Sequence, residues 1–177
     1  MGITRSMFLK SKKIAGFAAH QIQIAGKTVL IREASLADTK KLVEIEEAVY
    51  TGSAPWDQQA FVAEISRQHG KLYLSASIDD QTIAFLGLSY RKSSQDLHIT
   101  NIAVLPIWQS KGLGSYLMKL AGKLVLDNHL TTLSLEVRQS NFRAFQLYEK
   151  IGFKKTQELV GYYDGDHEDA IEMEWQL

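Results

Sequence analysis

From Thr28 onward, the apolar positions of the chain repeat with one of two periods. Short stretches in which apolar and polar residues alternate, or in which apolar and β-branched residues stand between turn residues, predict β-strands. Longer stretches with apolar residues three and four positions apart predict amphipathic helices. The predicted strands are 28–32, 72–78, 82–90, 97–104, 133–137, 153–160 and 170–175, and the predicted helices are 36–50, 56–68, 113–125 and 141–150.

The ends of the last helix carry clear signals. Asn141 is placed to cap its N-terminus, and Gly152 suits a left-handed stop at its C-terminus. The elements follow each other as one strand, two helices, three strands, a helix, a strand, a helix and two strands. This order predicts a mixed α/β (α+β) domain with a mostly antiparallel sheet of about seven strands and flanking helices.

Length and composition indicate one compact domain. The chain has 177 residues and no cysteine, and a single domain commonly takes about 100–200 residues. The lack of cysteine excludes disulfides, zinc–thiolate sites, iron–sulfur clusters and a cysteine nucleophile. The longest uncharged run near the start, Ile14 to Gly26, is interrupted by polar residues and falls short of a membrane span, and its apolar core, Ile14 to Ala19, is too short for a signal peptide. We therefore expect a cytoplasmic protein.

Charge is unevenly distributed, although the formal net charge is zero. Residues 1–32 contain six basic residues and no acidic one, which leaves 14 basic and 20 acidic residues downstream. A basic N-terminal extension, residues 1–27, therefore precedes an acidic domain, residues 28–177. The extension is either a solvated, flexible tail, as termini often are, or an arm that contacts RNA or the acidic face of the domain.

The segment 101–115 points to a phosphate-binding site. Its strand ends at Val104, Pro106 follows, and a loop with Gly112 and Gly114 opens the long helix. Unpaired backbone N–H groups and the positive end of the helix dipole face such a loop, and glycines let a ligand approach the backbone. Helix N-termini of this kind bind phosphate, although the same glycines also suit a plain tight turn. The P-loop and dinucleotide-binding fingerprints are both absent.

The next segment, 134–153, resembles the second half of the GNAT N-acetyltransferase core. The loop from Gln109 to Gly114 resembles the motif that holds the pyrophosphate of acetyl-CoA in that family. The resemblance covers residues 28–177 and implies the GNAT fold, in which the two central strands splay apart at the cofactor site. Leu105 and Trp108 depart from the residues usual at their positions, and residues 1–27 match nothing in the family.

Three features narrow the resemblance to RimI-type alanine N-acetyltransferases of ribosomal proteins. They are Leu135-Glu136-Val137-Arg138 followed by Ser140-Asn141, the loop Ala54-Pro55-Trp56, and the terminal Tyr162-Tyr163 with Glu168-Asp169-Ala170-Ile171 and Met173.

The resemblance implies acetyl-CoA as co-substrate and no metal. The backbone of 102–104 would pair with the pantetheine arm like an added strand, and Asn141 would bind the same arm besides capping its helix. The cofactor-binding residues implied in this way are Ile102, Ala103, Val104, Gln109, Ser110, Lys111, Gly112, Leu113, Gly114, Ser115, Asn141 and Tyr148.

Glu136 and Tyr148 are the catalytic residues that the resemblance implies. Glu136 would accept the proton of the acceptor amine, directly or through a water, and Tyr148 would protonate the departing thiolate. An N-terminal α-amine has a pKa of about 7.7–8.0 and is partly neutral near pH 7, whereas a lysine amine is neutral only about once in 2,500. A carboxylate therefore suffices as the base for an α-amine, and acetyl would move by direct attack in a ternary complex. A structural interpretation also exists for each residue: an outward-facing strand position for Glu136 and a helix-core aromatic for Tyr148.

Trp56, Tyr162 and Tyr163 are predicted to bind the acceptor, close to the acidic run 164–169. An acidic, aromatic rim suits a basic peptide such as the start of a ribosomal protein, but a solvated hairpin turn explains the acidic run equally well. The sequence thus predicts an N-terminal protein acetyltransferase. The alternatives are a GNAT enzyme acting on a small amine, a polyamine or a lysine side chain, and a GNAT protein that binds acyl-CoA without catalysis.

Overall fold

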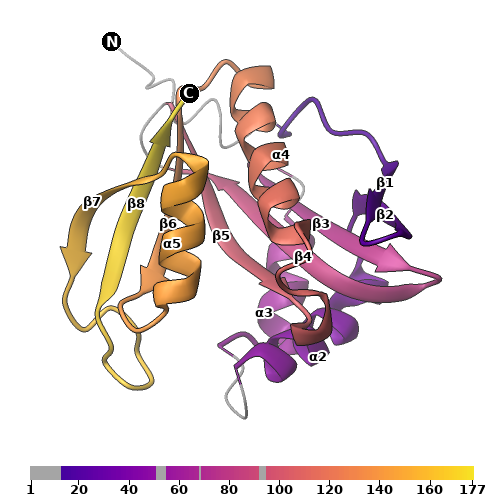
Figure 1. Ribbon diagram of the computed structural model, residues 1–177, viewed down its shortest axis with the longest axis horizontal. Helices are drawn as coiled ribbons and strands as arrows, with labels where there is room; N and C mark the ends of the chain where they lie inside the picture. The colour runs from indigo at the N-terminus through magenta and orange to yellow at the C-terminus, as the bar shows by residue number, and fades with distance from the viewer. Residues whose placement is uncertain (1–12, 51–54, 68, 92–94) are drawn as a thin grey trace.

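The computed structural model describes residues 13–50, 55–67, 69–91 and 95–177, which build an eight-stranded sheet with helices on both faces (Figure 1). The strand order across the sheet is β1-β2-β3-β4-β5-β6-β8-β7. The strands are β1 (His20–Ile24), β2 (Lys27–Glu33), β3 (Lys71–Ile78), β4 (Gln81–Tyr90), β5 (Asp96–Val104), β6 (Thr132–Arg138), β7 (Lys154–Leu159) and β8 (Ala170–Gln176). The helices are α2 (Thr39–Val49), α3 (Gln58–Ile65), α4 (Leu113–Asp127) and α5 (Phe142–Ile151), with short 3-10 turns η1 (Leu36–Asp38) and η2 (Pro106–Trp108).

Two apolar clusters, one on each face of the sheet, hold the helices in place. The larger cluster joins the sheet to α4 and α5, and its members include Leu117 and Leu135. The smaller one joins the sheet to α2 and α3, where Leu42 and Phe61 pack with Phe85. Figure 1 shows α4 and α5 in front of the sheet and α2 and α3 behind it. None of the helices in the described residues is long and apolar enough to cross a membrane.

The strands β5 and β6 diverge at the centre of the sheet. They pair in parallel from Asp96 and Thr132 to His98 and Ser134, and within the described residues no pairing between them continues further, although both strands do. The other neighbouring strands are antiparallel. The expected splay of the central strands is therefore present, and it leaves the β6-facing edge of β5 free over 99–104.

The predicted order of elements is confirmed, with one strand added at the start. The prediction of about seven strands missed β1, which pairs antiparallel with β2. Ala25 and Gly26 join the two strands with positive φ angles of 49° and 77°, as a two-residue hairpin turn requires. At the other end of the domain, Asn141 caps α5 by accepting a hydrogen bond from the Ala144 N–H at 3.1 Å, and Gly152 ends the helix with a φ of 129°.

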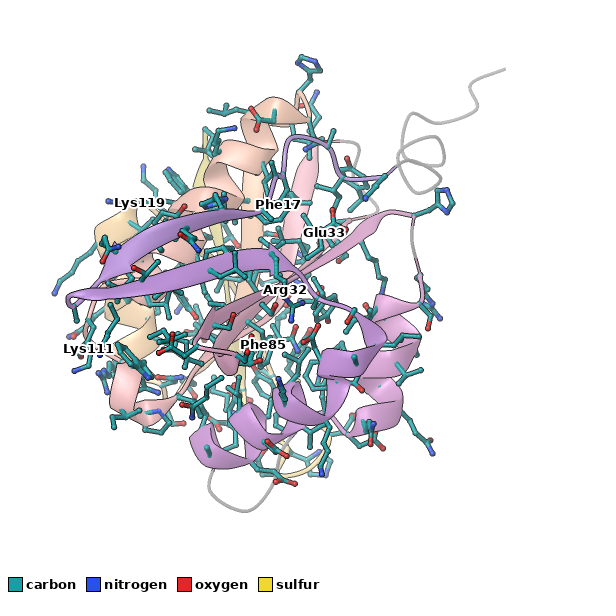
Figure 2. The ribbon with its side chains drawn as sticks, turned by 90° about the vertical axis from the view of Figure 1, so that its right-hand side faces the viewer. Phe17, Arg32, Glu33, Phe85, Lys111 and Lys119 are labelled. Atoms are coloured by element: carbon teal, nitrogen blue, oxygen red, sulfur yellow. The ribbon has the colours of Figure 1, made fainter. Side chains whose placement is uncertain are left out.

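The described part of the N-terminal extension, residues 13–27, packs on the domain. Ile14 is 2% exposed, and the Ala15 N–H donates a hydrogen bond to Oδ1 of Asn128 at 2.9 Å. Lys13 forms an ion pair with Glu33 at 3.2 Å, and Figure 2 looks onto this edge of the sheet, with Glu33 labelled at the end of β2. The boundary expected between residues 27 and 28 falls inside β2, directly after its first residue, Lys27. Residues 1–12 lie outside the described residues, and contact of the basic arm with RNA stays a prediction.

Candidate active site

A cleft of about 490 Å³ opens where β5 and β6 diverge. Its walls come from β5, the start of α4, β6, α5 and the end of α2. The residues predicted from the sequence that line it are Trp56, Ile102, Ala103, Val104, Gln109, Ser110, Gly112, Gly114, Ser115, Glu136, Asn141, Tyr148 and Tyr163. The fold therefore brings most of the predicted cofactor, catalytic and acceptor residues to one place.

Three predicted residues do not line the cleft. The Leu113 side chain is fully buried in the core under α4, Lys111 is exposed, and Tyr162 is 46% exposed. Leu113 and Lys111 both belong to the glycine loop, and because the Leu113 side chain is buried, only its backbone is in a position to face a ligand. In the loop Ala54-Pro55-Trp56, Ala54 lies outside the described residues.

The glycine loop presents the N-terminus of α4 to the cleft. Gly112 is the N-cap of the helix, with the left-handed φ of 93°, and a Cβ at this position would meet no atom within 4 Å. A Cβ on Gly114 would stand 3.8 Å from Leu147 and 3.9 Å from Val104, both of which line the cleft. Open space over unpaired N–H groups at a helix N-terminus fits a diphosphate.

A cation also lies beside this loop. Arg143, on the first turn of α5, donates hydrogen bonds to Oε1 of Gln109 at 3.1 Å and to the hydroxyl of Ser110. Gln109 in turn donates to the Val104 carbonyl at 2.9 Å. The loop is thus tied both to α5 and to the end of β5, and the guanidinium adds positive charge where the helix dipole already favours an anion.

Glu136 is held in the cleft wall by two basic side chains. Its side chain is 7% exposed, Oε2 lies 3.0 Å from Nε2 of His98, and Oε1 accepts a hydrogen bond from Arg91. Burial alone would raise the pKa of Glu136, but His98 and Arg91 outweigh it and hold the pKa below its usual value. The carboxylate is therefore ionised at neutral pH, in the cleft and not on the outer surface.

The contacts of Glu136 continue in both directions. Arg91 also binds Glu172 at 2.5 Å. On the other side, Nδ1 of His98 lies 2.9 Å from the Ser134 hydroxyl, which donates to Oδ2 of Asp96 at 2.7 Å. Asp96 is buried, and this raises its pKa to about 6. A continuous polar chain of side chains thus runs from the cleft wall into the sheet.

Tyr148 is buried in the wall of the cleft. It is 9% exposed and packs against Phe153, with the ring centroids 5.8 Å apart. Burial, followed by the nearby Tyr50 and Tyr163, raises the pKa of its hydroxyl above the usual value. The side chain therefore carries its proton at neutral pH, and it is both a core aromatic and a cleft residue.

The predicted acceptor side of the cleft is aromatic, and ion pairs compensate much of its acidic charge. The Arg138 guanidinium stacks 4.0 Å above the ring of Tyr163. It also pairs with Asp166 at 2.8 Å and with Glu168 at 2.7 Å. Glu168 further accepts a hydrogen bond from the Ser140 N–H at 2.8 Å. These two carboxylates thus tie the loop after β7 to Arg138, and Glu168 also ties it to Ser140.

Residues 39–153 match the acetyltransferase (GNAT) family. The chain belongs to this family. It is 30% identical to an N-alpha-acetyltransferase of Saccharolobus solfataricus over 84% of this chain and 93% of that protein. It is 31% identical to the ribosomal-protein alanine N-acetyltransferase of Haemophilus influenzae over 81% of this chain and 96% of that protein. The crystal structure of the corresponding Escherichia coli enzyme aligns with a TM-score of 0.72 at 28% identity, covering 84% of this chain and 93% of that one.

Four residues at the site of this GNAT acetyltransferase were not predicted from the sequence. They are Glu46 and Arg143, which line the cleft, and Arg91 and His98, which contact Glu136. His98 carried a weak signal, because the alternation in β5 puts it on the same face as Asp96. The departures at Leu105 and Trp108 are accommodated by packing, since both side chains lie against the apolar core.

Proposed function

We propose that this enzyme transfers acetyl from acetyl-CoA to the α-amine of a protein, with the N-terminal alanine of a ribosomal protein as the acceptor, in the cytoplasm. The names of its relatives in Saccharolobus solfataricus and Haemophilus influenzae support the α-amine and the ribosomal protein, respectively. The observation that carries the proposal is the cleft through the splayed sheet, with the glycine loop at one end and an ionised Glu136 in its wall.

The two faces of β6 separate the donor from the acceptor. Leu133, Leu135 and Val137 belong to the core under α4 and α5, so Glu136 points to the opposite face, since side chains alternate along a strand. Acetyl-CoA would lie on the α4 side, along the free edge of β5 and over the glycine loop, and supply the acetyl thioester. The acceptor would then enter from the face that carries Glu136, Tyr163 and Trp56.

The chemistry of the transfer follows from the protonation states of the residues. Glu136 accepts a proton from the acceptor amine, directly or through a water, while it stays in contact with Nε2 of His98. The neutral amine nitrogen forms a bond to the acetyl carbon while the carbon–sulfur bond breaks. Tyr148 donates its proton to the departing thiolate and is reprotonated by the second proton, which the nitrogen loses as the amide forms. No covalent acetyl-enzyme is needed.

Turnover with three acceptors tests this function. CoA release is measured with a short basic peptide that starts with alanine, with the same peptide blocked at its α-amine but carrying a lysine, and with spermidine. We expect rapid release with the first and little with the other two, because the lysine and polyamine amines are protonated at neutral pH. Preference for spermidine or the lysine peptide would indicate the other acceptor class. No release with any amine would indicate a binding protein.

Replacing Tyr148 by phenylalanine should slow the reaction without stopping it. A thiol has a pKa near 8.5, so the leaving group needs little protonation at neutral pH, and we expect turnover to fall on the order of tenfold. The ring stays in contact with Phe153, so the melting temperature should change little. Steady-state CoA release from the alanine peptide, with a thermal melt of both proteins, measures the effect. Unchanged turnover would remove the acid role from Tyr148.

A further inference from the structure

Glu46 is a buried carboxylate in the cleft that the mechanism above leaves without a role. It lies on α2, is 2% exposed, and still lines the cleft together with Tyr50 and Trp56. Its Oε2 accepts a hydrogen bond from the Trp56 backbone N–H at 3.0 Å, and its Oε1 accepts one from Nδ2 of Asn101 at 3.4 Å. Neither donor carries a positive charge.

Within the part of the chain that the structure describes, no cation compensates the charge of Glu46. The ion pairs among the described residues include Glu136 with Arg91 and His98, but none with Glu46. Burying a carboxylate without a cation is costly, and burial raises the pKa of Glu46 to about 7. A carboxylate offers about four acceptor positions, and the two hydrogen bonds leave room for further donors from a ligand.

The surrounding residues fix this carboxylate in place. Asn101 lies against Gly87 of β4, where a Cβ would come within 2.4 Å of the Asn101 Oδ1, so the lack of a side chain at 87 makes room for it. The Trp56 ring packs on Phe61 with centroids 5.5 Å apart. Both hydrogen-bond donors of Glu46 are thus set by close packing, and the carboxylate is presented to the cleft in a defined orientation.

We propose that Glu46 binds the α-ammonium group of the incoming acceptor and so selects for free protein N-termini. This inference rests on the proposed function and adds the group that recognises the acceptor. A primary ammonium brings three N–H donors and the positive charge that the Glu46 carboxylate lacks. Glu46 on α2 and Glu136 on β6 line the same cleft, so one carboxylate holds the ammonium and the other takes its proton.

Because Glu46 titrates, the proposed binding of an ammonium group depends on pH. The groups around Glu46 are Tyr50, which directly follows α2, Tyr73 on β3 and the amide of Asn101 on β5. Burial raises the pKa of both tyrosines, so they stay neutral between pH 6 and pH 8. Glu46 is ionised above pH 7 and protonated below it, so the affinity for an ammonium should fall as the pH drops through 7.

The test compares two acceptors that differ in one charge. Binding of an alanine-starting basic peptide to the full-length protein saturated with CoA is measured by calorimetry at pH 8 and pH 6. The second ligand is the same peptide with lactic acid in place of alanine, which puts a hydroxyl where the ammonium was. We expect the wild type to prefer the ammonium about tenfold or more at pH 8, and to lose most of this preference at pH 6.

Glu46→Gln should abolish the preference at both pH values. Glutamine keeps an oxygen for the Trp56 N–H, so the loop contact survives while the charge is lost. Glu47→Gln, one residue on and exposed, is the matched control and should behave as wild type. A Glu46→Gln protein that still prefers the ammonium would overturn the proposal.

A measurement on the wild type does not depend on how the variant folds. Near pH 7, Glu46 is about half protonated, so binding the ammonium peptide should release protons that binding the hydroxyl peptide does not. Calorimetry in two buffers with different ionisation enthalpies detects them, and equal release with both peptides would overturn the proposal. Turnover with an unaltered preference in Glu46→Gln would refute this role and leave the proposed function intact. If the wild type prefers the ammonium peptide as expected but acetylates none of the acceptors, the role of Glu46 stands and the proposed function is refuted.

Discussion

Replacing Glu136 by glutamine lowers the acetylation rate of an alanine-starting peptide by about 10²–10⁴-fold at neutral pH, the range that a positioned acid or base contributes. The amide has nearly the shape of the carboxylate but cannot take the proton of the ammonium. Because His98 and Arg91 keep the pKa of Glu136 below its usual value, the wild-type carboxylate is ionised throughout the physiological range. The loss in the variant should therefore be similar at pH 7 and pH 8.

The measurement is kcat with saturating peptide, together with the affinity for CoA. Glu136 faces the acceptor side, so the CoA affinity of Glu136→Gln should stay close to that of the wild type. Glu174→Gln is the matched control, because Glu174 lies on β8, its side chain accepts a bond from Gln176, and it does not line the cleft. A kcat within about threefold of wild type in Glu136→Gln would place the proton acceptor elsewhere.

Local sequence patterns were sufficient to predict most of the strands and helices. The alternation in β3 and β4, the helical spacing in α4, and the end signals at Asn141 and Gly152 each depend on residues close together in the chain. β1 was missed because residues 1–27 were interpreted as an extension, although Ile22 and Ile24 alternate with glutamines as in a strand. The turn that joins it to β2 has alanine at a positive φ, where glycine or asparagine would have been a clearer signal.

The site was predictable only where a motif marks it. The glycine loop has a recognisable local sequence, and Glu136 and Tyr148 were reached by family resemblance. Arg91, His98 and Glu46 depend on contacts between segments distant in the chain. His98 meets Glu136 because β5 and β6 pair in one particular parallel register, and Glu46 meets Asn101 because α2 packs across β5. Spacing along the sequence does not encode such registers.

If the diphosphate binds at the first turn of α4, Gly114→Ala should raise the stability of the protein and lower its affinity for CoA. Gly114→Ala replaces glycine by the best helix former near the start of α4, where the new Cβ would make ordinary contacts at 3.8 Å and 3.9 Å. The variant should therefore be more stable to unfolding by about 0.5–1 kcal/mol. The same methyl group projects into the cleft, next to Leu147 and Val104, and keeps a ligand away from the backbone N–H groups.

We expect the affinity of Gly114→Ala for CoA to fall about tenfold or more, since a hydrogen bond to a charged group contributes about 1.5–3 kcal/mol. Acetyl-pantetheine lacks the diphosphate and serves as the control ligand, so its KM should change far less. Calorimetry with CoA, urea unfolding and turnover with acetyl-pantetheine separate the three effects. A stabilised variant that binds CoA as tightly as the wild type would show that the diphosphate does not rest on this helix. A variant equally impaired with both donors would show that the methyl group acts on the thioester end of the cleft instead.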